Sequence, residues 1–119
     1  MKTTLVIGAS ENTERYSNMA MKLLQEYGHP VIAVGNKAGM VNGIPIETGT
    51  PHFENVDTVT LYLGPKNQVP VYPYILSLKP GRVIFNPGTE NPELQKLLNE
   101  KGIAWEEACT LVLLRTGGY

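Results

Sequence analysis

The feature that most limits the fold of this chain is the alternation of short apolar runs with helical patterns. The runs are rich in Val, Ile, Leu and Thr, which is typical of strands buried on both faces. We expect them at residues 3–7, 31–34, 58–63, 82–85 and 103–106. Strands separated by helices in this way form right-handed βαβ units. The sequence therefore predicts an α/β fold, a small doubly wound, Rossmann-like parallel sheet of about five strands with helices on both faces.

Start and stop signals delimit the intervening helices. Ser17 is a suitable N-cap for the first helix, and Gly28 suits its end. A second helix is expected to begin near Pro70, because two prolines do not fit deep inside one helix. Asn91 and Pro92 are typical of the start of a third.

Two segments give weaker signals. Residues 36–56 are interrupted by Gly and Pro, and only Ile44 and Ile46 suggest a strand there, a short one at the edge of the sheet. The apolar tail, residues 109–114, fits either a strand or a short helix.

Composition excludes several classes of function. A length of 119 residues suits one domain, which we expect to span residues 1–119. Lys plus Arg is 10 and Asp plus Glu is 11, a balance that argues against a nucleic-acid partner. The one cysteine excludes an internal disulfide and a cysteine-built zinc site. Because the first residues resemble neither a signal peptide nor a membrane span, we expect a cytoplasmic protein with no membrane partner.

A doubly wound sheet binds its ligands at the carboxyl ends of the strands, where the strand order reverses. The loops that follow residues 7, 34, 63 and 85 are therefore the candidate site. In the first loop, Gly8 permits a tight turn, Ser10 offers a hydroxyl and the helix start near Ser17 suits a phosphate. The dinucleotide pattern G-x-G-x-x-G is only half present there, so an ordinary strand-to-helix turn is an alternative.

The second and third loops favour a phosphorylated nucleotide. Lys37 lies where NAD-binding domains place an acidic residue, and a lysine suits a phosphate on the ribose, as in NADP or coenzyme A (CoA). A solvated surface lysine is the alternative. Gly64 and Pro65 fix a sharp exit from a strand and leave the backbone open to a flat group such as adenine.

No pattern predicts a catalytic residue. Neither His29 nor His52 has a recognisable partner, and no cluster of metal ligands is evident, so we expect no metal. Cys109 most simply behaves as a small hydrophobe. We hypothesise that it forms a mixed disulfide with a ligand thiol if it ends a strand at the site.

Segments from the whole chain resemble one family, the small single-domain CoA-binding proteins, which are similar to the CoA-binding Rossmann domain of the succinyl-CoA ligase alpha subunit. The segments that carry the resemblance are residues 6–10, 15–17, 28–29, 34–37, 57–62, 86–90 and 107–109.

The resemblance implies CoA held by its 3′-phospho-ADP part. The residues that match the family's binding positions are Gly8, Ala9 and Ser10 in the glycine-rich turn, Arg15 and Ser17 facing the phosphates, Asn36 and Lys37 near the ribose phosphate, and Leu63, Gly64 and Pro65 beside the adenine. Tyr16 departs from the proline that the family often has there. The ligase's phosphorylated histidine has no counterpart in this chain, so the resemblance implies binding without ligase activity.

The sequence thus predicts a non-catalytic CoA or acyl-CoA binding protein. The alternative is a small NADP-linked oxidoreductase or another nucleotide-binding enzyme. A third reading is an interaction protein that keeps the fold without the ligand.

Overall fold

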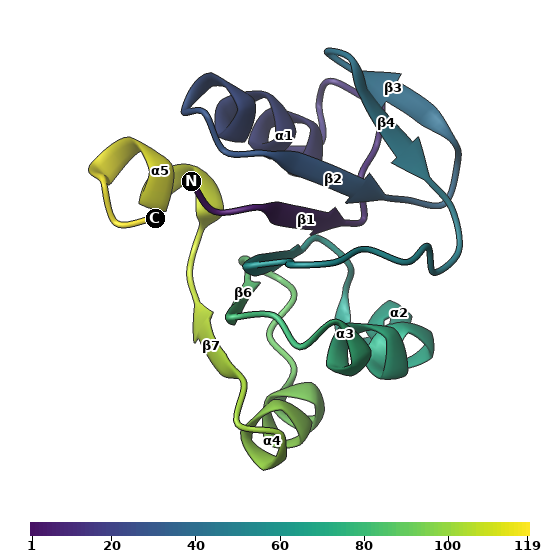
Figure 1. Ribbon diagram of the computed structural model, residues 1–119, viewed down its shortest axis with the longest axis vertical. Coiled ribbons are helices and arrows are strands. Elements are labelled where there is room, and N and C mark those ends of the chain that lie inside the picture. Colours follow the sequence, from purple (N-terminus) through teal and green to yellow (C-terminus); the bar gives the residue numbers. More distant parts are fainter.

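The computed structural model describes residues 1–119 and combines one sheet with helices on both of its faces (Figure 1). The strands are β1 (Thr4–Ile7), β2 (Val31–Val34), β3 (Gly39–Val41), β4 (Ile44–Glu47), β5 (Thr58–Leu61), β6 (Arg82–Phe85) and β7 (Ala104–Glu107). The helices are α1 (Tyr16–Glu26), α2 (Pro65–Gln68), α3 (Tyr72–Leu78), α4 (Pro92–Glu100) and α5 (Thr110–Thr116), with a 3-10 turn, η1 (Val69–Val71), between α2 and α3. The predicted fold class is confirmed, and the apolar tail is a helix.

The sheet has seven strands in the order β3-β4-β2-β1-β5-β6-β7. Every pairing is parallel except that of β3 with β4. From the central strand β1 the chain moves to β2 on one side, and it later returns to β5 on the other side. The strand order therefore reverses between β1 and β5, which is where a doubly wound sheet opens a crevice.

The two strands beyond the five apolar runs form a hairpin, of which the sequence pattern indicated only the second strand. Asn42 and Gly43 form the turn between β3 and β4, with φ of 48° and 81°. Positive φ at both central residues matches the right-handed twist of the flanking strands, and Asn-Gly is the dipeptide that best adopts it. The strand expected at Ile44 and Ile46 exists as β4, but it lies inside the sheet. The edge strand is β3.

Two helix starts differ from expectation. Ser17 is not the N-cap of α1, because the helix begins one residue earlier, at Tyr16, with Arg15 in the cap position. The second helical region begins at Pro65 rather than near Pro70. It passes through three short pieces, because a proline lies near the start of each and ends the hydrogen-bond pattern of the piece before it.

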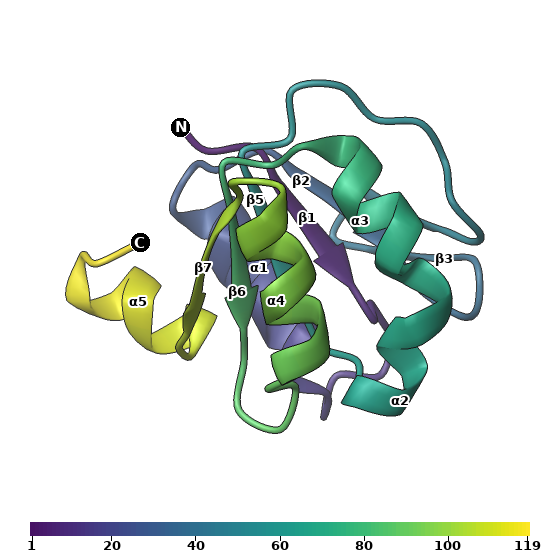
Figure 2. The same cartoon turned by 90° about the horizontal axis from the view of Figure 1, so that it is seen from below.

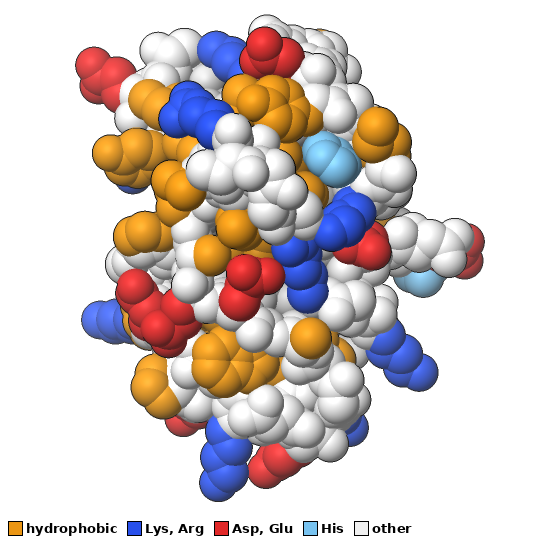
Figure 3. Space-filling view, turned by 90° about the vertical axis from the view of Figure 1, so that its left-hand side faces the viewer, with side chains coloured by type: hydrophobic (Ala, Val, Ile, Leu, Met, Phe, Trp, Pro, Cys, Tyr) orange, Lys and Arg blue, Asp and Glu red, His pale blue; other side chains and the backbone are white.

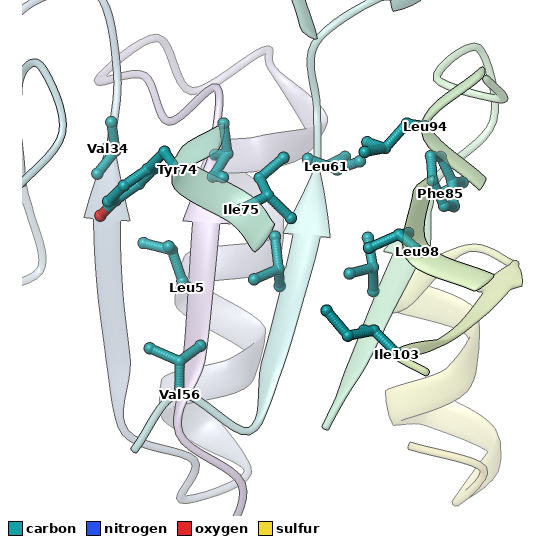
Figure 4. Close-up of a cluster of buried hydrophobic side chains, with 13 residues drawn as sticks. Leu5, Val34, Val56, Leu61, Tyr74, Ile75, Phe85, Leu94, Leu98 and Ile103 are labelled. Carbon is teal, nitrogen blue, oxygen red and sulfur yellow. The ribbon is translucent and has the colours of Figure 1, made fainter. Parts of the chain in front are cut away.

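Each face of the sheet buries a separate hydrophobic cluster. The larger cluster packs β1, β5 and β6 against α3 and α4 and contains Leu5, Leu61, Ile75, Phe85 and Leu98 (Figure 4). The smaller one packs the opposite face against α1 and α5. Viewed from below, α3 and α4 cross the front of the sheet while α1 lies behind it (Figure 2).

The amino end of the sheet is closed by the end of the chain. The Tyr119 ring lies 4.3 Å from the Arg82 guanidinium carbon and 4.8 Å from the His29 ring. Its hydroxyl bonds the side chain of Thr4, and the Lys2 ammonium donates to its main-chain oxygen. The surface on this side of the molecule mixes basic, acidic and apolar side chains (Figure 3). The opposite, carboxyl end of the sheet is open and forms a crevice.

Candidate ligand-binding crevice

The crevice lies at the carboxyl ends of β1 and β5, and glycine makes the close approach of these strand ends possible. Gly8 has φ of 95°, and a Cβ there would lie 2.9 Å from the Tyr62 carbonyl carbon. At the end of β2, a Cβ on Gly35 would lie 2.3 Å from the carbonyl oxygen of Ala9. No side chain fits at either position, so both glycines are required by the geometry of the turn.

The crevice has a volume of about 800 Å³. Nine of the ten predicted site residues line it: Gly8, Ala9, Ser10, Arg15, Ser17, Asn36, Lys37, Leu63 and Gly64. Pro65 does not line it and instead occupies the first position of α2. The remaining lining residues, none of which was among the predicted site residues, are Glu11, Asn12, Tyr16, Tyr62, Asn67, Pro87, Gly88 and Thr89.

Two cations face the crevice without ion-pair partners. The ion pairs of the molecule join His52 to Glu54 and Arg82 to Glu106. Neither pair involves Arg15 or Lys37, both of which are exposed. These two side chains can therefore turn toward an anionic ligand without breaking an existing ion pair.

The start of α1 is suited to an anion. The helix has no side-chain cap and no acidic residue in its first turn, so its first amide groups keep their partial positive charge. By contrast, Asn91 caps α4 by accepting hydrogen bonds from the amides of Glu93 and Leu94. Of these two helices, only α1 presents free amide groups, and it does so at the crevice.

Hydrogen bonds from the turn to β2, and from α1 to the turn, hold the segment before α1 in place. The amides of Gly8 and Ala9 both donate to the carbonyl of Val34, at 2.9 and 3.0 Å, so neither is available to a ligand. The buried side chain of Asn18 donates to the carbonyl of Ser10 at 2.9 Å. Gly8 and Ala9 thus contribute shape to the crevice, and Ser10 contributes polar groups.

A fully buried glutamine joins two loops of the opposite wall. The Gln68 side-chain nitrogen donates to the carbonyls of Leu63 and Thr89, each at 2.8 Å. Its oxygen accepts from the Asn91 side chain at 2.9 Å. That amide also donates to the Tyr72 hydroxyl at 2.7 Å. We call Gln68 and Asn91 the amide network, and it fixes the loops after β5 and β6 relative to each other.

The first loop is attached to the edge strand by Glu11. The Glu11 carboxylate accepts a hydrogen bond from the amide of Met40 at 2.9 Å. A Cβ on Gly39 would lie 2.4 Å from the carboxyl carbon of Glu11, so the carboxylate occupies the space that a side chain on β3 would take. Glu11 therefore connects the loop after β1 to the hairpin at the edge of the sheet.

Tyr62 lines the crevice at the end of β5, and its hydroxyl is buried without a hydrogen-bond partner. Burial raises the pKa of this phenol to about 12. The nearby hydroxyls of Thr110 and Thr60 offset part of that increase in pKa, although neither has the geometry of a hydrogen bond to the phenol. Tyr62 is thus neutral at physiological pH.

The remaining reactive side chains lie outside the crevice lining. Cys109 is half-buried at the start of α5, and neither His29 nor His52 contributes to the wall. The condition of the mixed-disulfide hypothesis, a cysteine at the crevice, is therefore not met by the lining residues. No three His, Cys, Asp or Glu side chains converge in a way that suits a metal ion. None of the helices has the length and apolarity needed to cross a membrane.

Solved structures share this fold over the full chain. One, described only as an uncharacterized protein, is 53% identical, with a TM-score of 0.97, and the match covers 100% of this chain and 98% of that one. A Thermus thermophilus protein, cell-free ID.343, is 26% identical with a TM-score of 0.86, over 99% of this chain and 90% of that one.

A more distant structure shares the fold alone. It is a dinucleotide-forming acetyl-coenzyme A synthetase 1 from Ca. Korarchaeum cryptofilum, in complex with phosphate and ADP, and it is 15% identical with a TM-score of 0.72. The match covers 90% of this chain and only 25% of the synthetase.

Sequence comparison agrees with the fold. No curated protein matches the chain. The sequence model of the CoA binding domain family matches residues 2–115. Because that match spans nearly all of the sequence, the chain belongs to the CoA binding domain family.

Proposed function

We propose that this protein is a single domain, residues 1–119, that binds CoA or an acyl-CoA without catalysing a reaction. The observation that carries the proposal is the crevice itself. Two unpaired cations, Arg15 and Lys37, and the uncapped start of α1 converge at the point where the strand order reverses. Because the chain belongs to the CoA binding domain family, CoA is the anion that we assign to this arrangement.

We assign the lining residues to three parts of a 3′-phospho-ADP group: the diphosphate, the ribose 3′-phosphate and the adenine. Ser10, Arg15 and Ser17 surround the start of α1, where free amides and a cation favour the diphosphate. Asn36 and Lys37 follow β2 and take the ribose 3′-phosphate. The adenine lies against the turn of Leu63 and Gly64, and Pro65 supports that turn from outside the crevice.

A binding role fits the chemistry of the lining side chains. General acid–base catalysis is most effective when the pKa of the group lies near the working pH. Tyr62 has a pKa of about 12, which is far from that range. The charged lining residues, Glu11, Arg15 and Lys37, suit recognition of a charged ligand. A carrier, a sensor or a subunit that docks on an enzyme is consistent with such a site.

The decisive experiment is a thermal-shift comparison of CoA, dephospho-CoA, NADP and NAD at matched concentrations. A ligand present at a hundred times its Kd stabilises the folded state by about 2.7 kcal/mol, which is readily seen. We expect a large increase in Tm with CoA and a smaller one with dephospho-CoA. A shift with NADP alone would contradict the proposal and favour the oxidoreductase alternative. The absence of a shift with any of the four would favour a scaffold without this ligand.

A further inference from the structure

We propose that Glu11 makes the crevice select adenosine ligands that carry a 3′-phosphate and a free 2′-hydroxyl over those that carry a 2′-phosphate. The inference rests on the proposed function and specifies the class of nucleotide that the site accepts. It concerns the half of the crevice formed by the first loop and by the residues after β2.

The position of the Glu11 carboxylate is set by two contacts. One oxygen accepts the hydrogen bond from the Met40 amide, a donor on the open side of the edge strand β3. Gly39 supplies the space for the carboxyl carbon, because a Cβ there would lie only 2.4 Å away. The other carboxylate oxygen has no hydrogen-bond partner, so it remains free to accept one from a ligand.

This position has a chemical counterpart in dinucleotide-binding sheets. There, an acidic residue at the end of the second strand accepts a hydrogen bond from the ribose 2′-hydroxyl. In this chain β2 is followed by Gly35, Asn36 and Lys37, none of which is acidic. Glu11 comes from the loop after β1 and its carboxylate reaches the strand that follows β2, while Glu11 and Lys37 are both among the residues that line the crevice. The negative charge of Glu11 and the positive charge of Lys37 in the proposed ribose site thus come from different loops.

The two charges then separate the isomers. With a 3′-phosphate paired to Lys37, the neighbouring 2′-hydroxyl can donate to the free oxygen of Glu11. With a 2′-phosphate, that donor is lost and a phosphate meets a carboxylate, a like-charge contact that disfavours the wrong ligand. Glu11 is therefore the repulsive element of the site, and Lys37 is the attractive one.

The test compares two isomers of equal charge, adenosine 3′,5′-bisphosphate and adenosine 2′,5′-bisphosphate, by calorimetric titration of the whole chain. The variant is Glu11→Gln, which keeps an oxygen to accept from Met40 but removes the charge. The matched control is Glu14→Gln, which removes the same charge from the same loop at an exposed position outside the crevice lining. We expect the native chain to prefer the 3′,5′ isomer. Glu11→Gln should reduce that preference about tenfold, equivalent to about 1.4 kcal/mol, and Glu14→Gln should leave it unchanged.

The outcomes separate this inference from the proposed function. If the native chain prefers the 3′,5′ isomer and Glu11→Gln keeps that preference, Glu11 is only a structural link and the inference is wrong. The inference is equally wrong if the native chain prefers the 2′,5′ isomer, or if Glu14→Gln reduces the preference as much as Glu11→Gln does. Binding of neither isomer, and of no CoA, would instead overturn the proposed function.

Discussion

The two walls of the crevice are held by different means. On one side, Ser10, Glu11 and Arg15 belong to an exposed or half-buried loop that is held by short-range turns, by the Asn18 side chain on the carbonyl of Ser10 and by the Glu11 contact to β3. On the other side, Gln68 and Asn91 are buried and join the loops after β5 and β6 by hydrogen bonds, two of which are long-range. Buried polar contacts cost more to break than exposed ones. We call the side held by Gln68 and Asn91 the amide wall and the side formed by the loop of Ser10, Glu11 and Arg15, together with Lys37, the charged wall. The amide wall is therefore rigid before a ligand arrives, and the charged wall can adjust its side chains around phosphates.

The largest effect is expected from breaking the rigid wall. Gln68→Leu leaves the carbonyls of Leu63 and Thr89 without this donor in a buried setting, at about 1–3 kcal/mol for each unsatisfied group. We expect the free energy of unfolding to fall by about 2–4 kcal/mol, measured by urea denaturation. CoA should also bind more weakly at temperatures where the variant is still folded.

The control for this change is Gln95→Leu. Gln95 is also buried but donates to Glu107 at 2.8 Å, away from the crevice lining. It should cost about 1 kcal/mol of stability and leave the affinity for CoA intact. Equal losses of affinity in the two variants would show that the amide network has no special role in the crevice.

The charged wall should respond in the opposite way. Lys37→Ala removes an exposed cation, so we expect stability to stay within about 0.5 kcal/mol. Affinity for CoA should fall about ten- to a hundredfold, the equivalent of roughly 1.5–3 kcal/mol, while affinity for dephospho-CoA stays unchanged. Titration of both ligands checks this result, with the exposed Lys66, which does not line the crevice, replaced by Ala as the matched control. Equal loss for both ligands would refute the assignment of Lys37 to the 3′-phosphate.

A smaller effect is expected at the contact between the charged wall and the edge strand. Gly39→Ala places a methyl group against the flexible end of Glu11, which can move away. We expect less than about 1 kcal/mol of lost stability but a reduced preference for the 3′,5′ isomer. Gly35→Ala is the contrast, because the same methyl meets the backbone oxygen of Ala9 at 2.3 Å and the turn itself must shift. If Gly39→Ala keeps the full preference, the Glu11 carboxylate is not the discriminating group.

The smallest effect at neutral pH is expected between the walls, at Tyr62. Since its hydroxyl has no partner, Tyr62→Phe should change the stability by no more than about 0.5 kcal/mol at pH 7. The pKa is raised from 10.0 to about 12 in the folded state, so the folded state holds this proton more tightly. That contribution is fully present below pH 10.0 and is lost as the pH rises toward 12. Unfolding measured at successive pH values should therefore show a shallower alkaline decline for the variant, and identical profiles would contradict the raised pKa.

The parts of the molecule that follow from local patterns were predictable. Apolar runs located the parallel strands, and the rule that a doubly wound sheet binds ligands at the carboxyl ends of its strands predicted which loops form the crevice. The hairpin at Asn42 and Gly43 was also visible in the sequence, because that dipeptide is the strongest short signal for such a turn. It was missed because the neighbouring glycines and prolines suggested an irregular segment.

The amide network and the Glu11 contact were not predictable from local patterns. Gln68 and its acceptor Thr89 are separated by 21 positions, and Glu11 and Met40 by 29. Nothing in the residues around Gln68 indicates that its side chain is buried, because burial depends on how two loops from different strands meet. Similarly, Ser17 has the chemistry of an N-cap, but the loop before it brings Arg15 to that position instead.

The placement of the aromatic side chains gives the molecule two separate optical reporters. The one tryptophan, Trp105, lies on the edge strand β7, with its ring 5.9 Å from that of Phe85 and outside the crevice lining. The fluorescence of Trp105 should change when the β6–β7 edge loosens and should stay unchanged when a ligand occupies the crevice. Tyr16 and Tyr62 line the crevice, so their ultraviolet signals should change when a nucleotide enters. Tryptophan fluorescence can thus follow unfolding at an edge of the sheet that is separate from the crevice, without an added dye.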